Sequence, residues 1–342
     1  MLRELICVEP AAPPRLSIRP RASPRPVNGQ VLVRVEAASV NPIDVKRADG
    51  YGKRVLKLKG AGRFPLVLGN DLAGVIEEVG AGVSRFQKGQ HVFGLVATGK
   101  NGGAHASQVL VDENNLMAAP AGAELRMLAT LPYSFTTMWL AVHSTGLRAG
   151  NAAFRRVLIS GASGALGRLA LSLLVAWRCD LTAICDVGRC DDALALGAHK
   201  AVERGTSAVA ALPSEFDAVL NFGAWESEPM LIAKLGQRAM GYATTVHPLM
   251  ANFDRLGWLP GIPANLRDFK RMRSAVRSRS NAANYAWTLF KPDRVALDAL
   301  EAGVQAGIYS LPIGIAQPFE AAISVFDYIA QGKPGRGVLL PG

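Results

Sequence analysis

The spacing of apolar and polar positions changes character near residue 126. Before that point, runs with strand character occur at 30–40, 72–80 and 108–120, separated by Gly, Pro and Asn turns. After it, a helical stretch is followed by short apolar runs that alternate with helical segments. The first pattern predicts a β-rich segment without a long helix, and the second predicts a domain of a different class.

The second pattern is typical of right-handed βαβ units, in which helices join parallel strands. The candidate strands lie at 156–160, 180–186, 200–203, 216–223 and 238–246. Amphipathic helices at 293–308 and 319–332 and a strand at 337–340 end the chain. We therefore expect an α/β protein with a doubly wound parallel sheet. Its parts would be a β-rich domain at 1–125, a parallel-sheet domain at 126–291, and a return to the first domain at 292–342.

Three glycines follow the first of these strands, in the stretch RVLISGASGALGRLALSLL. Gly161 suits a tight turn, Gly164 lets a phosphate approach the backbone, and Gly167 allows close helix–strand packing. The unpaired N–H groups at the helix start suit a pyrophosphate. The motif alone is also compatible with a packed turn without a ligand. Its position as the first βα crossover of a parallel sheet favours a dinucleotide.

An acidic residue, Asp186, ends the second candidate strand, 25 residues after Gly161. A carboxylate there is placed to accept hydrogen bonds from the adenosine ribose hydroxyls. It could equally cap the helix that begins near Arg189. Both interpretations stay open on the sequence alone.

The formal net charge of +11 on 342 residues is concentrated partly in the stretch NLRDFKRMRSAVRSRS. We favour a solvated helix face for its six cations, and the alternative is a rim that attracts an acidic substrate or the extra phosphate of NADP. They are Arg267, Lys270, Arg271, Arg273, Arg277 and Arg279. No zinc-finger, helix-turn-helix or RNA-binding signature accompanies them, so nucleic acid is not expected as a partner.

Hydrophobic residues make up 49% of the chain and charged residues 19%, as in ordinary globular proteins. No run of about 18 apolar residues predicts a membrane span, and the start MLRELICVEP does not resemble a signal peptide. The four cysteines form no CxxC pair, so neither a disulfide framework nor a zinc cluster is predicted. This usage suits a reducing compartment, and we expect a cytoplasmic location.

Three long motifs stand in order before the glycine turn: AASVNPIDVKRADGYG at 37–52, FPLVLGNDLAGVIEEVGAGVSRFQKGQHVFG at 64–94, and GGAHASQVLVDENNLMAAP at 102–120. With that turn, they resemble the medium-chain dehydrogenase/reductase superfamily over nearly the whole chain. The resemblance implies a GroES-like β-barrel catalytic domain and a Rossmann domain. It also implies NADPH or NADH as cofactor, in the cleft between the domains, and pairing into a homodimer through Rossmann edge strands.

The metal ligands of the zinc-dependent members are missing from the matching positions. Asn41, Asn70 and a position near Tyr133 replace them, and residues 94–107 contain no Cys for a structural zinc. The chain is thus similar to the zinc-free quinone oxidoreductase and enoyl reductase branch, whose Asn-Pro-x-Asp signature is present as Asn41, Pro42 and Asp44. Its C-terminal half is similar to the mitochondrial reticulon-interacting oxidoreductases.

Two departures from that branch concern the cofactor. Members that use NADPH commonly have a Ser and an Arg at the end of the second strand, where this chain has Asp186 and Gly188, followed by Arg189. The acid favours NADH, and Arg189 could partly offset it. The common Arg-Gly-Lys near the C-terminus is Arg336-Gly337-Val338 here, so the lysine is lost.

The resemblance implies hydride transfer to a small-molecule quinone or other conjugated carbonyl. A hydrogen-bond donor is then needed at the substrate oxygen, and Asn41 and Tyr51 are the candidates, with Asp44 beside them. Asn41 could instead shape a turn, Asp44 could be structural, and His105 is a weaker candidate acid. The alternatives to a general reductase are a specialised pathway substrate or a partner-binding role. The predicted cofactor-binding residues are Gly161, Ala162, Ser163, Gly164, Ala165, Leu166, Gly167, Asp186, Arg189, Asn221, Phe222, Gly223, Thr244 and Thr137.

Overall fold

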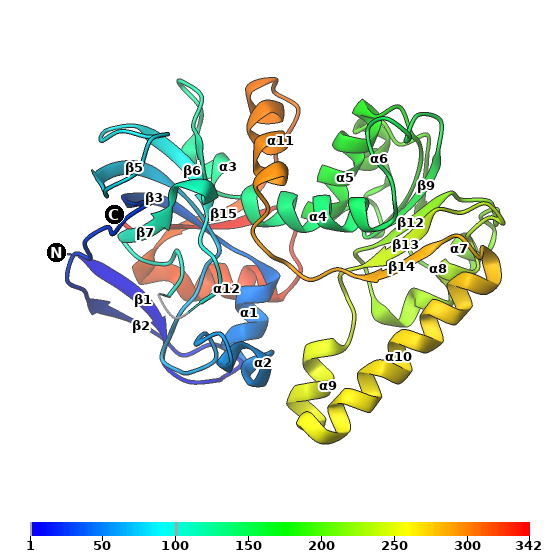
Figure 1. Cartoon of the computed structure of the whole chain (residues 1–342), viewed down its shortest axis with the longest axis horizontal. Helices are drawn as coiled ribbons and strands as arrows, with labels where there is room; N and C mark the ends of the chain where they lie inside the picture. The colour runs from blue at the N-terminus through cyan, green and yellow to red at the C-terminus, as the bar shows by residue number, and fades with distance from the viewer. Residues whose placement is uncertain (1, 100–101) are drawn as a thin grey trace. The chain divides into compact units, whose positions relative to one another are not determined.

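The change of pattern near residue 126 separates two units in the computed structural model, which describes residues 2–99 and 102–342 (Figure 1). The first unit comprises residues up to 133 together with 253–255 and 291–342. The second comprises 134–252 and 256–290. The first unit is thus made of segments from both ends of the chain.

The first unit is β-rich, with short helices between its strands. Its strands are β1 (Arg3–Cys7), β2 (Leu16–Pro20), β3 (Gln30–Val40), β4 (Leu66–Val67), β5 (Asp71–Val79), β6 (His91–Leu95), β7 (Gln108–Asp112), β8 (Leu116–Ala118), β15 (Ile313–Pro318) and β16 (Arg336–Leu340). Its helices are α1 (Pro42–Ala48), α2 (Lys53–Lys57), α3 (Leu125–Leu128), α11 (Arg294–Gln305) and α12 (Ala322–Ala330), with single 3₁₀ turns at Glu113–Asn115 and Phe319–Ala321.

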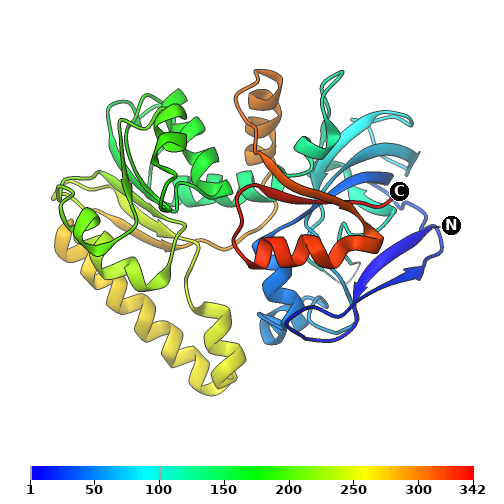
Figure 2. The same cartoon turned by 180° about the vertical axis from the view of Figure 1, so that it is seen from behind.

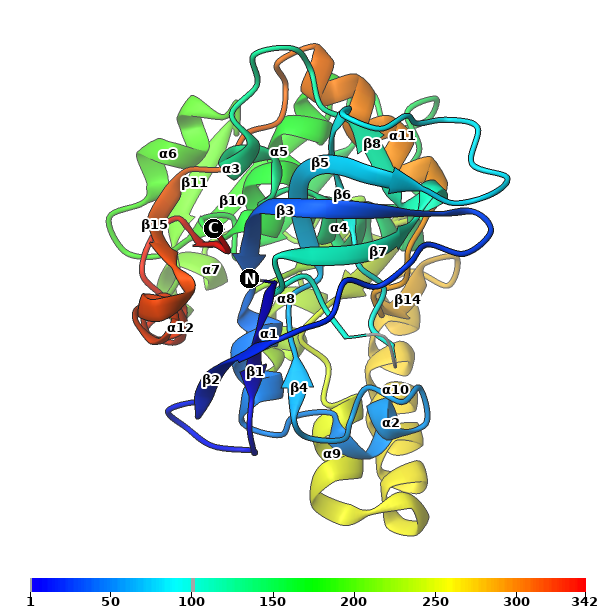
Figure 3. The ribbon, with the colours of Figure 1, turned by 90° about the vertical axis from the view of Figure 1, so that its left-hand side faces the viewer.

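The long strand β3 is the centre of the main sheet of this unit (Figure 3). Val31, Val33 and Val35 alternate along it, and all three side chains enter one apolar core. The sheet runs β15-β16-β3-β5-β6-β8, and β7 also pairs with β3. Among the described residues this is an open path, so the expected barrel does not close through its hydrogen bonds. A second sheet has the order β2-β1-β4.

The C-terminal helix α12 packs along β15 and β16 (Figure 2). Val325 and Ile329 on its buried face approach Gly337 of β16, where an added Cβ would lie 2.6 Å from a methyl carbon of Val325. The last strand therefore lies close beneath the helix, and this packing fixes the neighbouring Arg336 in the sheet.

The second unit contains one parallel sheet with helices on both faces. After α4 (Pro132–Ser144), the chain forms β9 (Arg156–Ser160), α5 (Ala165–Ala176), β10 (Asp180–Cys185), α6 (Cys190–Ala195), β11 (Lys200–Glu203), α7 (Thr206–Ala210), β12 (Ala218–Asn221), the 3₁₀ turn Trp225–Ser227, α8 (Glu228–Ile232), β13 (Gly241–Thr244), α9 (Leu249–Leu256), α10 (Trp258–Arg279) and β14 (Asn284–Trp287).

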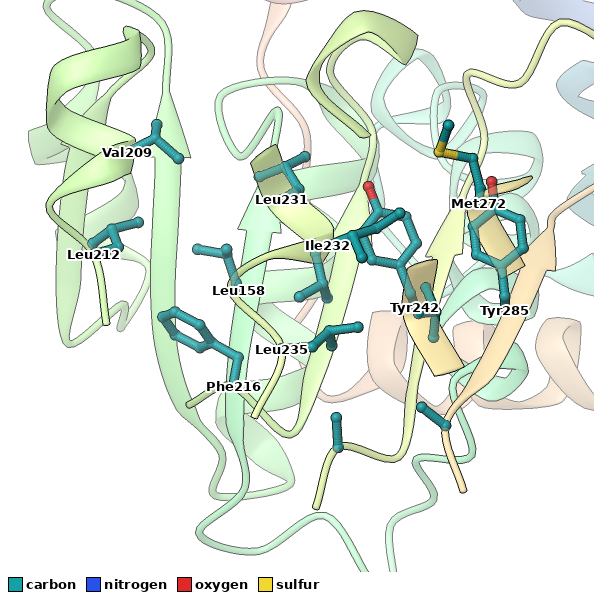
Figure 4. Close-up of a cluster of buried hydrophobic side chains, with 14 of the residues drawn as sticks. Leu158, Val209, Leu212, Phe216, Leu231, Ile232, Leu235, Tyr242, Met272 and Tyr285 are labelled. Carbon is teal, nitrogen blue, oxygen red and sulfur yellow. The ribbon is translucent and has the colours of Figure 1, made fainter. Parts of the chain in front are cut away.

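The strand order of this sheet is β11-β10-β9-β12-β13-β14, with every neighbour parallel. In chain order this is 3-2-1-4-5-6, the Rossmann arrangement. Figure 1 shows α5 and α6 on one face and α7, α8 and α10 on the other. Figure 4 shows the core under the second face, where Leu158, Leu231 and Tyr242 belong to the same cluster of buried side chains as Met272 of α10.

The unit boundaries differ from those expected at 125/126 and 291/292. Helix α3 packs on β3 and β5, and the backbone N–H of Tyr133 donates to Asp71, so residues 126–133 belong to the first unit. Residues 253–255 also join it, because Asp254 accepts hydrogen bonds from the backbone of Gly52 and Arg54.

Candidate active site

The glycine turn between β9 and α5 is shaped by close backbone contacts. Gly161 has φ +77°, and an added Cβ would lie 2.8 Å from the carbonyl carbon of Phe222. A Cβ on Gly167 would lie 2.4 Å from the Cα of Ala162. At Gly164 the nearest atom would be the Gly161 oxygen, at 3.4 Å. Gly161 and Gly167 are therefore required for packing, whereas Gly164 leaves one side of the turn open.

Some N–H groups of this turn donate to carbonyls within the protein, and others lie in the first turn of α5. Gly161 and Ala162 both donate to the carbonyl of Ile184, at 3.1 and 3.0 Å. Ala162, which the sequence placed among the cofactor-binding residues, is also buried, so its N–H serves the packing of the turn. The N–H groups of Ala165, Leu166 and Gly167 belong to the first turn of α5, where no helical acceptor exists. These three donors are the groups that would meet an anion at the start of the helix.

A cavity of about 500 Å³ opens at the carboxyl ends of the strands beside this turn. This is the place where doubly wound sheets bind ligands. Of the predicted residues, the lining contains Gly161, Gly164, Asp186, Phe222 and Gly223. Its other members are Ser160, Ile184, Cys185, Arg204, Gly205, Val209, Ala224, Ser227, Met230 and Leu231.

Asp186 faces an arginine that the sequence-based prediction missed. Its Oδ1 lies 3.3 Å from Nε of Arg204, and both side chains are more than half exposed. The backbone N–H of Asp186 donates to Oγ of Ser163 at 2.9 Å, so Ser163 joins the glycine turn to the end of β10. Arg204 directly follows the predicted strand 200–203, and the rule that ligands bind at the carboxyl ends of strands could have identified it.

Arg189 does not face this cavity. Its Nε donates to Asp192 at 2.7 Å, and Arg168 lies 3.5 Å from the same carboxylate oxygen. The hydrogen bond from Arg189 lowers the pKa of Asp192, the main effect on that carboxyl group. Arg189 is thus paired with Asp192 at the start of α6, and Arg204 rather than Arg189 lies beside Asp186.

Asn221 and Thr244, at the ends of β12 and β13, are fully buried and hold the loop rather than line the cavity. The Asn221 amide donates to the carbonyl of Ala224 and to Oε1 of Glu228, and its oxygen accepts from the N–H of Gly223. Asn221 therefore fixes Phe222 and Gly223 against the glycine turn. Thr137 lies buried on α4.

Glu228 is a buried carboxylate that the sequence did not single out. It accepts hydrogen bonds from the hydroxyls of Tyr242 at 3.0 Å and Tyr285 at 3.1 Å, besides the Asn221 amide. Burial raises the pKa of Glu228, and the donors around it act in the opposite direction. The cluster joins α8 to β12, β13 and β14.

In the first unit, Asn41 lies in a buried network centred on Asp71. The Asn41 amide donates to Asp71 at 2.8 Å and to Ser39 at 3.0 Å, and its oxygen accepts from Arg336. Ser39 also donates to Asp71, at 2.6 Å. Burial raises the pKa of Asp71 to about 6. Both N–H groups of the Asn41 amide are used in these bonds, so Asn41 positions Asp71. It has no N–H left for a substrate oxygen, which differs from the role expected from the motif.

Asp44, Asn70 and His105 also have structural roles. Asp44 accepts from the backbone N–H of Asn41 at 2.8 Å and of Gly69 at 2.9 Å, so it anchors α1 and has a structural role instead of the catalytic one that the motif suggested. Asn70 donates to the carbonyl of Val96 and to Thr98. His105 is buried with Nε2 2.9 Å from the carbonyl of Ser39, and burial lowers its pKa.

Tyr51 is the remaining catalytic candidate, and it is half-buried after α1. Its ring lies 5.7 Å from Nζ of Lys46, and it precedes Gly52, whose N–H donates to Asp254 at 2.5 Å. Burial, with a smaller contribution from the Asp254 charge, raises the pKa of Tyr51. The phenol therefore keeps its proton at neutral pH and can donate a hydrogen bond.

Comparisons with known proteins agree with this architecture. Residues 27–121 match the alcohol dehydrogenase GroES-like domain. The chain is 32% identical to the bovine (Bos taurus) NAD(P)H oxidoreductase RTN4IP1, mitochondrial, over 89% of this chain and 79% of that protein. The fold matches the quinone oxidoreductase from Coxiella burnetii with a TM-score of 0.81 at 18% identity, covering 100% and 99% of the two chains. CurK enoyl reductase matches with a TM-score of 0.79 at 20% identity, covering 99% of each chain.

The fold and the strand-end cavity define a medium-chain dehydrogenase/reductase with a GroES-like and a Rossmann unit. Within that class, the chain belongs to the family of NAD(P)H oxidoreductases represented by the mitochondrial relatives, in the quinone oxidoreductase branch.

The expected cytoplasmic location is contradicted by these relatives, which are named as mitochondrial in cattle, humans, zebrafish and mice. The prediction failed because unpaired cysteines indicate reducing conditions and do not distinguish one reducing compartment from another. No helix in the described ranges has both the length and the apolar character to cross a membrane. The same ranges contain no cluster of three or more His, Cys, Asp and Glu side chains fit to hold a metal ion.

The residues around the cavity fit a nicotinamide dinucleotide. The open side of Gly164 and the free N–H groups of the α5 first turn suit its pyrophosphate. Asp186 and Arg204 would meet the adenosine ribose, because Asp186 follows β10, the neighbour of β9, and Arg204 follows β11, the next strand of the sheet. The backbone at Phe222 and Gly223 lines the opposite side.

Proposed function

We propose that the protein reduces a quinone or an α,β-unsaturated carbonyl compound with NADPH or NADH, without zinc. The observation that carries the proposal is the cavity at the strand ends, with its glycine turn and its Asp186–Arg204 pair, in a chain of this family. The cofactor, when bound, supplies a hydride to the electrophilic carbon of the substrate. The protein must bind, orient and polarise the two reactants.

Independence from zinc is supported by the chemistry of the residues at the matching positions. Carboxamide side chains, Asn41 and Asn70, stand where metal-dependent members have Cys and His, and amides are poor zinc ligands. Both amides already donate to protein acceptors. Activation of the substrate carbonyl would then depend on a hydrogen-bond donor instead of a Lewis acid.

Tyr51 is the donor that we propose for the oxygen on which negative charge develops. Asn41 is engaged by Asp71, and Asp44 accepts two backbone hydrogen bonds, so neither can donate to a substrate. The raised pKa of Tyr51 keeps its hydroxyl protonated. Proton transfer to carbon, where the product needs it, can come from solvent.

NADPH is the cofactor that we propose as preferred. The 2′-phosphate is a dianion, and the planar guanidinium of Arg204 can bind it with paired hydrogen bonds. Asp186 would repel that phosphate, but its exposed side chain can turn toward solvent and release Arg204. With NADH, Asp186 would instead accept from the ribose hydroxyls.

The test is oxidation of NADPH and NADH, followed by absorbance, with 1,4-benzoquinone and with an enal such as trans-2-hexenal. We expect NADPH oxidation that 1,10-phenanthroline does not inhibit. Tyr51→Phe should lower kcat about tenfold to a thousandfold with little change in cofactor affinity. Tyr328→Phe removes a hydroxyl that donates to the carbonyl of Pro334 and is the matched control. No oxidation of either cofactor with either class of acceptor would refute the proposal.

A further inference from the structure

Helix α10 is attached to its unit unevenly along its length. In its C-terminal half, Met272 and Val276 enter the core and the Arg279 guanidinium donates to the carbonyl of Leu235. Among the described residues, none from 258–268 belongs to that core. The N-terminal half is held by polar contacts instead, including the bond from the Asn252 amide to Asn265 at 2.9 Å. This half extends past the sheet with α9 (Figure 1).

One exposed face of α10 carries aliphatic side chains followed by cations. The positions are Leu259, Ile262, Leu266, Lys270, Arg273 and Arg277. Their separations of three or four residues place all six in one stripe along the helix. Leu259 is 87% exposed and Leu266 52%, while Trp258 at the helix start is 39% exposed. We refer to these six residues as the α10 stripe.

In the part of the chain that the structure describes, the aliphatic side chains of the α10 stripe are left exposed and its cations are left without a carboxylate. Exposed leucine and isoleucine side chains grouped on one ridge leave apolar surface in water, and such patches mark interaction sites. The ion pair that α10 makes with a described acid joins Arg271 to Asp268 at 3.8 Å, off the stripe. Lys270, Arg273 and Arg277 have no carboxylate partner among the described residues. Their positive charge is therefore available to an anionic surface.

We propose that the α10 stripe docks the protein on an anionic lipid bilayer. The aliphatic half would enter the headgroup–acyl boundary, and Lys270, Arg273 and Arg277 would lie against the headgroups. Interfacial helices bury their apolar face about 5–10 Å into this boundary. Leu259 to Leu266 provide about 10 Å of helix length, at 1.5 Å per residue, that can lie along it. The net charge of +11 adds attraction to anionic lipid.

A bilayer suits this feature better than an acidic partner protein. The α10 stripe is a ridge on one helix, and its apolar and charged residues occupy successive lengths of it. A ridge enters a deformable interface directly, whereas a folded partner would need a matching groove. The proposal does not depend on the substrate or on the cofactor.

The test is flotation of the full-length protein with vesicles of phosphatidylcholine containing 30% phosphatidylglycerol, and with pure phosphatidylcholine vesicles. We expect binding to the anionic vesicles that weakens in salt. Replacing Lys270, Arg273 and Arg277 together by Glu should reduce the affinity at least about a hundredfold, because each cation near an anionic surface contributes about 1 kcal/mol. Leu259→Asp with Leu266→Asp should abolish binding.

The matched control replaces Arg25, Lys88 and Arg238 by Glu, which changes the net charge equally at exposed positions outside α10. Retained vesicle binding by this variant, with loss in both α10 variants, supports the proposal. Equal loss in the control would show non-specific charge attraction and overturn it. Unchanged vesicle binding by the variant with Leu259→Asp and Leu266→Asp would contradict insertion of the aliphatic side chains into the bilayer. Absence of vesicle binding, with self-association that the leucine variant abolishes, would assign the α10 stripe to a second copy of the chain.

All variants are checked by circular dichroism and by cofactor titration. Their positions are exposed and lie outside the strand-end cavity, so both signals should match the unmodified protein. Trp258 provides an independent measurement, since insertion moves its emission to shorter wavelength and exposes it to quenching by brominated lipid. Quenching that Trp258→Phe does not reduce would contradict the proposed depth.

Discussion

The guanidinium Nε of Arg204 lies 3.3 Å from Oδ1 of Asp186, although 18 positions separate the two residues in the chain. The register of the sheet explains this pairing. Cys185 of β10 stands opposite Glu203 of β11, and the N–H of Arg204 donates to the carbonyl of Cys185 at 2.7 Å. The residues that follow these partners therefore emerge together at the cavity. One acid and one base there can distinguish the two cofactors.

Arg204→Gln should lower the affinity for NADPH about tenfold to a hundredfold, because one charge-assisted set of hydrogen bonds to the 2′-phosphate is lost. The affinity for NADH should change little. The measurement is titration of reduced-cofactor fluorescence. Arg189→Gln is the control, because Arg189 is bound to Asp192. A larger loss of NADPH affinity in the Arg189 variant than in the Arg204 variant would assign the 2′-phosphate to Arg189 instead.

The two glycines Gly164 and Gly167 should respond differently to alanine. Gly167→Ala places a methyl group 2.4 Å from the Cα of Ala162, and such overpacking should cost about 1–3 kcal/mol of unfolding free energy. Gly164→Ala meets no atom closer than 3.4 Å, so the melting temperature should hold while cofactor binding weakens. Thermal unfolding and cofactor titration of both variants separate the effects. A stable Gly167→Ala protein would contradict the packing described here.

Ionisation of buried Asp71 should lower the free energy of unfolding as pH rises from 4 to 7. Burial raises its pKa from 3.8 to about 6 in the folded protein, so the folded state favours the protonated carboxyl group. The stabilisation that the protonated Asp71 carboxyl group gives the folded state is present in full below pH 3.8 and is lost as pH rises through 6. From this shift, the loss is at most about 3 kcal/mol.

The measurement for Asp71 is urea unfolding of the unmodified protein and Asp71→Asn across that pH range. Other carboxylates contribute equally to both proteins, so the difference in unfolding free energy isolates Asp71. We expect the unmodified protein to lose stability relative to the variant as pH rises. A difference that is flat, or that rises with pH, would show that Asp71 is ionised throughout.

Glu228→Ala should destabilise the second unit by about 3–5 kcal/mol. The change leaves the buried hydroxyls of Tyr242 and Tyr285 and the amide of Asn221 without their acceptor. Glu228→Gln keeps the volume and should lose less. Urea unfolding monitors the effect, with exposed Glu226→Ala as control, for which we expect a change within about 0.5 kcal/mol. Equal stability of the Glu228 and Glu226 variants would contradict the cluster.

The sequence determined the local features of this protein. Alternating valines predict β3, and its side chains enter one core because their period matches the strand. Gly161 and Gly167 stand where only a hydrogen fits, and this requirement was evident from the strand–glycine–helix order. The family resemblance rested on the same kind of contiguous motif, and the comparisons confirmed it.

The tertiary structure alone decided which polar side chains meet. Arg189 is nearer to Asp186 in the chain, but the geometry of α6 directs it to Asp192, and the sheet register brings Arg204 to Asp186. Asn41 resembles a free donor in its motif, yet Asp71 and Arg336, from β5 and β16, use both ends of its amide. Hydrogen bonds between distant segments depend on strand order and register, which hydrophobic periodicity does not encode.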